Sequence, residues 1–234
     1  MKIGTFLTLG SPEICEMLGN EIDFAVIDAE HGVLMDNTLI SVLRAIPSEI
    51  TPWVRVKRPE LASLALDLGA KAILIPQVRS MQDLNSAVES FYYPPKGQRG
   101  WGPGRVSRYG MDMMKIIQDE AINELWVQIE TREALEMVED IAAREEIDGL
   151  FVGPGDLSLA LGHPGEWSNE ELKSSTERIF EASRKNGKKF GIFTGNPAQV
   201  SFWDKKGADL VVFGADSIFF IEGYRNLMKE AGRQ

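Results

Sequence analysis

The sequence has few of the features typical of secreted, membrane or nucleic-acid-binding proteins. Its 234 residues include one cysteine, Cys15, so no disulfide can form within the chain. This favours a reducing compartment and predicts a cytoplasmic protein. No apolar run approaches the roughly 18 residues that span a bilayer, and the first residues lack the order of a signal peptide. The formal net charge of −10 repels phosphate backbones, which argues against a nucleic-acid partner.

Several common catalytic motifs are also missing. There are only two histidines and no Cys/His cluster that suits zinc. The sequence has neither GxxxxGK[ST] nor GxSxG, and the glycine-rich RGWGPGR does not join a strand to a helix as a dinucleotide fingerprint does. We therefore expect no organic cofactor.

What the chain does contain is a regular alternation of short apolar runs and longer amphipathic stretches. The runs cover 4–9, 23–29, 52–56, 72–78, 125–130, 149–153, 189–195 and 209–215. Helical periodicity marks 61–70, 131–146 and 169–187, and glycines at 69, 187 and 207 are expected to end helices. Eight strand–helix repeats predict an α/β fold, a single (β/α)8 TIM barrel over residues 1–234. An open doubly wound sheet is the alternative.

Five polar residues lie at or just after the ends of four of these runs. They are His31, Arg55, Gln128, Glu130 and Asp156. The carboxyl ends of the strands of such a barrel meet at one mouth, so we expect these side chains to share a cavity. Two carboxylates at close range need a cation or a shared proton. This pattern predicts a metal site with a cationic group and a base beside it.

Glu130 and Asp156 are predicted to end adjacent strands, the fifth and the sixth. Two carboxylates with water suit Mg²⁺ or Mn²⁺ and leave room for a bidentate substrate. The alternative is that each carboxylate caps the helix that follows it.

Two further groups have competing interpretations. Arg55 could hold a carboxylate or an enolate oxygen, or form a structural ion pair. His31, with Asp28 and Glu30 beside it, could be a base or a loop histidine bonded to backbone. By alternation Lys57 shares a strand face with Arg55, and it is the only candidate for a Schiff-base nucleophile.

The segment 92–112 breaks the repeat. It is rich in glycine, proline and arginine and carries Trp101 and Tyr109. Long loops within compact domains are usually functional or disordered, and its aromatic content predicts an ordered one.

Six segments, in order and at suitable spacing, resemble the HpcH/HpaI aldolases. They are DAEHG, VRV, LDLGAKAILIPQV, YPPKGQRG, VQIETREAL and FVGPGDLSLALG. These proteins are metal-dependent class II pyruvate aldolases on a (β/α)8 barrel of the phosphoenolpyruvate/pyruvate-binding type. The resemblance covers nearly the whole chain. It departs at Gly155, where the family usually has Ala.

The resemblance implies a role for each matching residue. His31 stands at the general base, Glu130 and Asp156 at the metal ligands, and Arg55 at the arginine that stabilises the enolate. Substrate-contacting positions match Gln128, Gly155, Asp156 and Arg55.

It also implies an assembly. Asp67 matches an acid that reaches the histidine of a neighbouring subunit, and Asp28 helps to orient that base. The family forms hexamers, which are trimers of dimers. The apolar last helix, 216–232, independently favours an oligomer, unless it packs on its own barrel.

The predicted function is reversible cleavage of a 4-hydroxy-2-oxoacid to pyruvate and an aldehyde by a carbon–carbon lyase that uses Mg²⁺, Mn²⁺ or Co²⁺. One alternative is a citrate-lyase-like enzyme acting on acyl-CoA esters on the same barrel. Another is a non-catalytic binding protein on a decayed barrel. The aldehyde and the physiological metal are left open.

Overall fold

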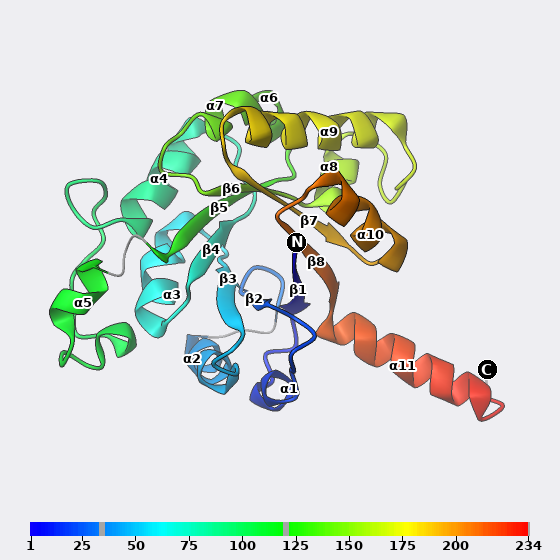
Figure 1. The fold of residues 1–234 in the computed structure, drawn as a ribbon, viewed down its shortest axis with the longest axis horizontal. Coiled ribbons are helices and arrows are strands. Elements are labelled where there is room, and N and C mark those ends of the chain that lie inside the picture. The colour runs from blue at the N-terminus through cyan, green and yellow to red at the C-terminus, as the bar shows by residue number, and fades with distance from the viewer. Residues whose placement is uncertain (33–35, 119–121, 234) are drawn as a thin grey trace.

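The computed structural model, which describes residues 1–32, 36–118 and 122–233, is a closed barrel of eight parallel strands with helices around it (Figure 1). The strands pair in chain order, and the eighth pairs with the first. They are β1 (Lys2–Leu7), β2 (Phe24–Asp28), β3 (Thr51–Arg55), β4 (Ala72–Ile75), β5 (Glu124–Ile129), β6 (Gly149–Val152), β7 (Lys189–Thr194) and β8 (Leu210–Ala215). The predicted (β/α)8 barrel is therefore confirmed, and the open sheet is not formed.

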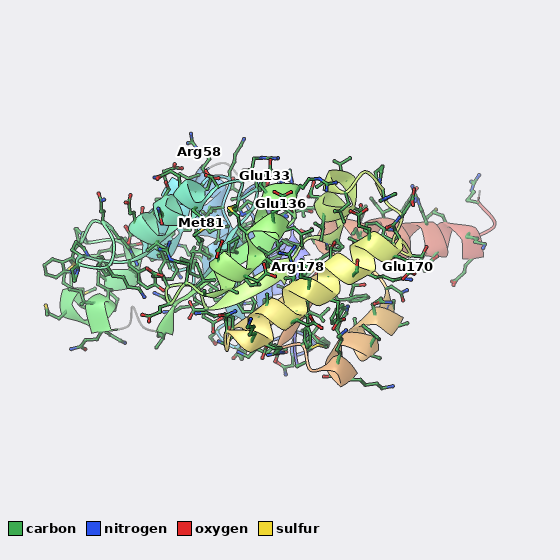
Figure 2. All side chains as sticks on the ribbon, turned by 90° about the horizontal axis from the view of Figure 1, so that it is seen from above. Arg58, Met81, Glu133, Glu136, Glu170 and Arg178 are labelled. Atoms are coloured by element: carbon green, nitrogen blue, oxygen red, sulfur yellow. The ribbon has the colours of Figure 1, made fainter. Side chains whose placement is uncertain are left out.

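Helices connect successive strands and cover the barrel. They are α1 (Pro12–Glu16), α2 (Asp36–Ala45), α3 (Ala62–Leu68), α4 (Met81–Phe91), α5 (Met113–Gln118), α6 (Arg132–Glu136), α7 (Val138–Ala142), α8 (Pro154–Ala160), α9 (Glu170–Lys185), α10 (Pro197–Lys206) and α11 (Asp216–Glu230), with 3-10 turns η1 (Pro59–Leu61) and η2 (Arg105–Ser107). Figure 2 shows α9 crossing the molecule, with Glu170 and Arg178 labelled along it. Gly69 and Gly207 end α3 and α10 with positive φ, as predicted. The predicted helix 131–146 is instead two short helices that meet at Met137.

The barrel interior is filled by large side chains in its amino-terminal half. Phe24, Trp53 and Trp126 form a chain of rings with centroids 4.9 and 5.0 Å apart. Gly149 makes room for this stack, because a Cβ there would lie 2.4 Å from the ring of Trp126. The amino end of the barrel is thus plugged by apolar groups, and polar side chains lie at the carboxyl end.

The last helix leaves the barrel. Figure 1 shows α11 pointing away from the strands, with the C-terminus at its far end. Every residue from Ile218 to Arg233 is exposed, although seven residues between Ile218 and Met228 are large and apolar. The alternative, that this helix packs on its own barrel, therefore holds only for its first turn, where the rings of Phe219 and Phe213 lie 5.8 Å apart. No helix in the described ranges is long and apolar enough to cross a membrane.

The segment 92–112 is ordered, as predicted. The side chains that attach it to the barrel are not the two aromatic ones on which the prediction relied. Trp101 and Tyr109 are exposed, whereas Tyr92 and Arg99 are buried. The Arg99 guanidinium donates to Asp67 of α3 at 2.6 Å, and Arg105 donates to the carbonyl of Leu68 at 2.7 Å. This segment is thereby attached to the end of α3 that precedes β4.

Candidate active site

Alternation along the strands directs the polar residues inward. In β2, β3 and β5, Phe24, Val26, Trp53 and Trp126 belong to the inner cluster, whereas Ala25, Ile27, Val54, Val127 and Ile129 pack against the helices. Because strand side chains alternate, Asp28, Arg55, Gln128 and Glu130 fall on the inner face. All four are buried. The expected convergence of Arg55, Gln128 and Glu130 at one mouth is therefore present.

Asp28 and Arg55 form a two-pronged ion pair. They are opposite each other in the β2–β3 register. Arg55 Nε donates to Asp28 Oδ1 at 2.9 Å and Nη2 donates to Oδ2 at 2.6 Å. The guanidinium also lies over the ring of Phe6, 4.6 Å from its centroid. This fork fixes the plane of Arg55, which a single point charge could not do.

The same carboxylate folds the turn that carries His31. Asp28 Oδ1 accepts the backbone N–H groups of Glu30 at 3.1 Å and His31 at 3.3 Å. Such side-chain-to-backbone bonds are the means by which Asp stabilises turns. Asp28 therefore orients the His31 backbone and the Arg55 side chain together.

Glu30 is a site residue that the sequence analysis did not assign. Its Oε2 lies 3.4 Å from Arg55 Nε and 3.6 Å from His31 Nε2. Burial raises the pKa of Glu30 to about 7; Arg55 opposes this, while repulsion from Asp28 and Asp156 adds to it. Glu30 is thus the carboxylate that contacts both the Arg55 guanidinium and His31, the predicted base.

Glu130 is held by amide groups of two residues, Gln77 just after β4 and Gln128 in β5. Its Oε1 accepts the backbone N–H of Gln77 at 2.8 Å and the Gln77 side-chain amide at 3.1 Å, and its Oε2 accepts from Gln128. Gly153 allows this packing, because a Cβ there would lie 2.7 Å from Glu130 Oε2 and 2.6 Å from Gln128 Nε2. Gln77 is a second residue that the sequence analysis missed.

Asp156 reaches the site from a helix and not from a strand end. β6 ends at Val152, and Asp156 lies in the first turn of α8. Gly155 beside it is exposed, and a Cβ at that position would meet nothing within 4 Å. The capping alternative fails for Glu130, because Thr131 is the residue that caps α6.

The carboxylates suit a divalent cation that completes its shell with substrate and water. Burial raises the pKa of Glu130 to about 7, the bond from Gln77 opposes this, and Glu30 and Asp156 raise it further by repulsion. Among the described residues, no three His, Cys, Asp or Glu side chains form a ready-made metal cluster. Mg²⁺ commonly binds through one or two carboxylates with substrate and water, and Glu130 Oε2, which within the described part of the chain accepts only from Gln128, keeps a second lone pair for it. Glu130 and Asp156 therefore fit such an ion.

Two other predicted residues lie apart from this group. Asp67 is at the end of α3 that leads into β4, near the amino ends of the strands, whereas His31 follows the carboxyl end of β2. One chain does not bring them together. Lys57 is exposed, because β3 ends at Arg55 and the alternation that would turn Lys57 inward stops there.

Comparison with known proteins assigns the chain to a family. The HpcH/HpaI aldolase/citrate lyase family matches residues 2–223. The chain belongs to this family. It is 34% identical to the 5-keto-4-deoxy-D-glucarate aldolase of Escherichia fergusonii, covering 97% of this chain and 91% of the relative.

Solved structures show the same relationship. An HpcH/HpaI aldolase/citrate lyase family protein from Burkholderia cenocepacia J2315 superposes with a TM-score of 0.92 at 32% identity, over 98% of this chain and 94% of the other. The citrate synthase SbnG gives a TM-score of 0.86 at 27% identity, over 99% and 91%. Family and relatives confirm the prediction of a metal-dependent class II pyruvate aldolase, a carbon–carbon lyase.

Proposed function

We propose that this enzyme cleaves a 4-hydroxy-2-oxoacid at its mouth, with Glu130 and Asp156 holding the divalent metal. The observation that supports this most strongly is the inward convergence of Arg55, Gln128 and Glu130 around Asp28, above a plugged barrel. When bound, Mg²⁺, Mn²⁺ or Co²⁺ supplies positive charge for the 2-oxo acid end of the substrate. Gln128 and the backbone of Gly155 bind that same end.

Different residues then move the proton and stabilise the developing charge. His31 takes the proton of the C4 hydroxyl, the C3–C4 bond breaks, and the aldehyde forms. The bond electrons pass to the C2 oxygen of the enolate, where Arg55 stabilises the charge. Return of a proton from His31 to C3 of the enolate gives pyruvate and restores the base. Asp28 holds Arg55 and the turn at His31 in position for these steps through hydrogen bonds to both.

The relatives supply a candidate substrate. The Escherichia fergusonii protein is named for 5-keto-4-deoxy-D-glucarate, a sugar-derived acid. We propose an acid of this kind as the substrate of this cytoplasmic enzyme, with small molecules, and neither nucleic acid nor membranes, as its partners.

We also propose that the enzyme is an oligomer, with a hexamer as the expected state. The exposed part of α11 supports this, because its seven large apolar side chains between Ile218 and Met228 lack the free energy that burial would supply. The side chain of His31 is also 61% exposed. A neighbouring copy that brings Asp67 to His31 would cover this base and raise its basicity.

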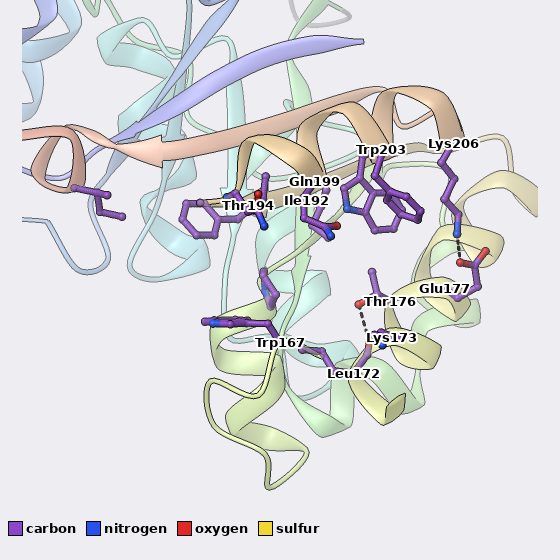
Figure 3. A pocket seen from close by; sticks show the side chains of 16 residues that line it. Trp167, Leu172, Lys173, Thr176, Glu177, Ile192, Thr194, Gln199, Trp203 and Lys206 are labelled. Atoms are coloured by element: carbon purple, nitrogen blue, oxygen red, sulfur yellow. Dashed lines mark hydrogen bonds and ion pairs between the residues drawn. The ribbon is translucent and has the colours of Figure 1, made fainter. Parts of the chain in front are cut away.

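A groove on the barrel surface offers an apolar surface for such a contact. Its volume is about 670 Å³, and it lies between α9 and α10, beside the carboxyl end of β7. Figure 3 shows Trp167 and Trp203 on opposite sides of this groove, with the Lys206–Glu177 ion pair at one end. The carboxylates of the candidate site do not line it. The groove is therefore separate from those carboxylates.

A panel of 4-hydroxy-2-oxoacids, assayed for pyruvate release with added divalent metal, tests the function. We expect release from at least one member and no inactivation by borohydride with pyruvate, because no Schiff base forms. Release that requires coenzyme A, or a pyruvate adduct on Lys57, would replace this proposal by the acyl-CoA lyase or the Schiff-base mechanism. Absence of turnover with intact metal binding would favour a non-catalytic binding protein.

A further inference from the structure

The backbone just after β4 adopts an unusual conformation beside the candidate site. Gln77 has a φ of +52°, in the left-handed region that residues other than glycine seldom adopt. Its N–H and side-chain amide both donate to Glu130. The flanking backbone is also fixed, because Thr131 donates to the carbonyl of Val78 and the N–H of Arg79 donates to Asp83. The strained residue is thus held by its own bonds to Glu130 and by the fixed backbone that follows it.

Gln77 connects Glu130 to an arginine at the rim. Its Nε2 lies 3.1 Å from Glu130, while its Oε1 accepts from Arg79 Nη2, also at 3.1 Å. One side-chain amide and two hydrogen bonds therefore separate the Arg79 guanidinium from the proposed metal ligand. A substrate whose 2-oxo acid end lies at Glu130 has its other end within reach of this rim.

Arg79 has capacity to bind an anion. Its side chain is 59% exposed, and its other contact is a long one, 3.5 Å from Nη1 to Glu133, a residue labelled in Figure 2. Exposed pairs of this kind contribute little free energy, so a substrate anion can replace Glu133. Arg55, in contrast, is buried, its Nη2 and Nε meet Asp28 and Glu30, and its proposed role is at the enolate oxygen.

We infer that Arg79, positioned by Gln77, binds an acidic group on the aldehyde half of the substrate and determines specificity for 4-hydroxy-2-oxo diacids. This inference rests on the proposed aldolase function. Arg79 supplies a planar guanidinium that matches a carboxylate. Gln77 is a positioning residue, since it accepts from Arg79 and fixes the guanidinium relative to Glu130.

The test compares two substrates of equal carbon number, 4-hydroxy-2-oxohexanedioate and 4-hydroxy-2-oxohexanoate, by pyruvate release with Mg²⁺ or Mn²⁺. We expect the wild-type kcat/KM to favour the diacid by about 10- to 100-fold, the value of a hydrogen-bonded charge. Arg79→Gln should lower this ratio towards one through the diacid alone, leaving the neutral-ended substrate essentially unchanged. Arg79→Lys should retain part of the preference.

Two further variants separate the positioning role of Gln77 from a general effect of positive charge at the rim. Gln77→Asn, which tolerates the left-handed backbone but is too short to bridge, should also lower the ratio, and adding it to Arg79→Gln should lower the ratio no further. Arg58→Gln, which removes the same charge after β3, is the matched control and should leave the ratio as in wild type.

Three results would overturn the inference: no diacid preference in the wild type, an equal loss on both substrates in Arg79→Gln, or an equal drop in the ratio in Arg58→Gln. Failure of the wild type on the entire panel would instead refute the aldolase function.

Discussion

At the scale of residues, Arg55 has a structural role in its ion pair with Asp28 and a proposed chemical role at the enolate. It is 8% exposed and donates through two nitrogens to Asp28. Arg55→Lys keeps the charge but loses the fork, so we expect kcat/KM for pyruvate release to fall by about 10²-fold or more, as for loss of an oxyanion donor. Arg58→Lys, at an exposed position after the same strand, is the matched control. Wild-type kcat/KM in Arg55→Lys would make Arg55 a structural residue only.

Two glycines in FVGPGD provide a matched pair at the same scale. Gly153→Ala places a Cβ against Gln128 and Glu130, so we expect unfolding free energy to fall by about 1–3 kcal/mol and metal affinity to fall with it. The Cβ that Gly155→Ala adds would meet nothing within 4 Å, and the position lies in the first turn of α8. The unfolding free energy should therefore rise by about 0.5–1 kcal/mol. Urea unfolding of both variants measures this, and equal effects would contradict the packing described for Glu130.

Sequence reasoning identified the site residues whose position follows from alternation. Arg55, Gln128 and Glu130 lie where an alternating strand places them. Glu30 and Gln77 were missed because neither lies in a strand. Glu30 turns inward through hydrogen bonds to Asp28, and Gln77 does so through a positive φ, which no pattern of residues in this chain reveals.

At the scale of elements, α11 is the clearest departure from a self-contained barrel. Phe220 and Leu227 are 69% and 64% exposed. If a second copy covers this helix, Phe220→Glu with Leu227→Glu should lower the mass in solution towards that of the 26.0 kDa chain. Light scattering measures the mass, with Lys229→Glu as a charge-changing control on the same helix. A monomeric wild type, or an unchanged mass in the double variant, would refute this role of α11.

Other elements show where sequence patterns succeed and fail. Eight apolar runs gave eight strands, because parallel strands buried on both faces need continuous apolar residues. The pattern at 131–146 did not reveal the break at Met137, since apolar periodicity persists across it. Asp156 was expected at a strand end, but Pro154 begins α8 before it.

For the whole molecule, the separation of His31 from Asp67 has a testable consequence. If each site combines residues of two copies, mixing inactive His31→Ala with inactive Asp67→Ala subunits should restore part of the activity. Pyruvate release after subunit exchange measures it, with each variant alone as the control. Exchange without recovery would contradict a shared site.

The sequence predicted the barrel of the whole molecule because local periodicity determines it. Assembly stays a proposal, because no pattern within one chain identifies a partner for α11. The surplus of apolar residues in the last helix is the one local feature of the sequence that favours it.

Metal dependence tests the central claim most directly. Pyruvate release from an active panel substrate is measured after treatment with EDTA, after return of Mg²⁺, Mn²⁺ or Co²⁺, and in the Glu130→Ala/Asp156→Ala double variant. We predict that chelation abolishes release, that metal restores it, and that the double variant stays inactive with metal present. Full activity of the double variant, or of the chelated wild type, would contradict the account.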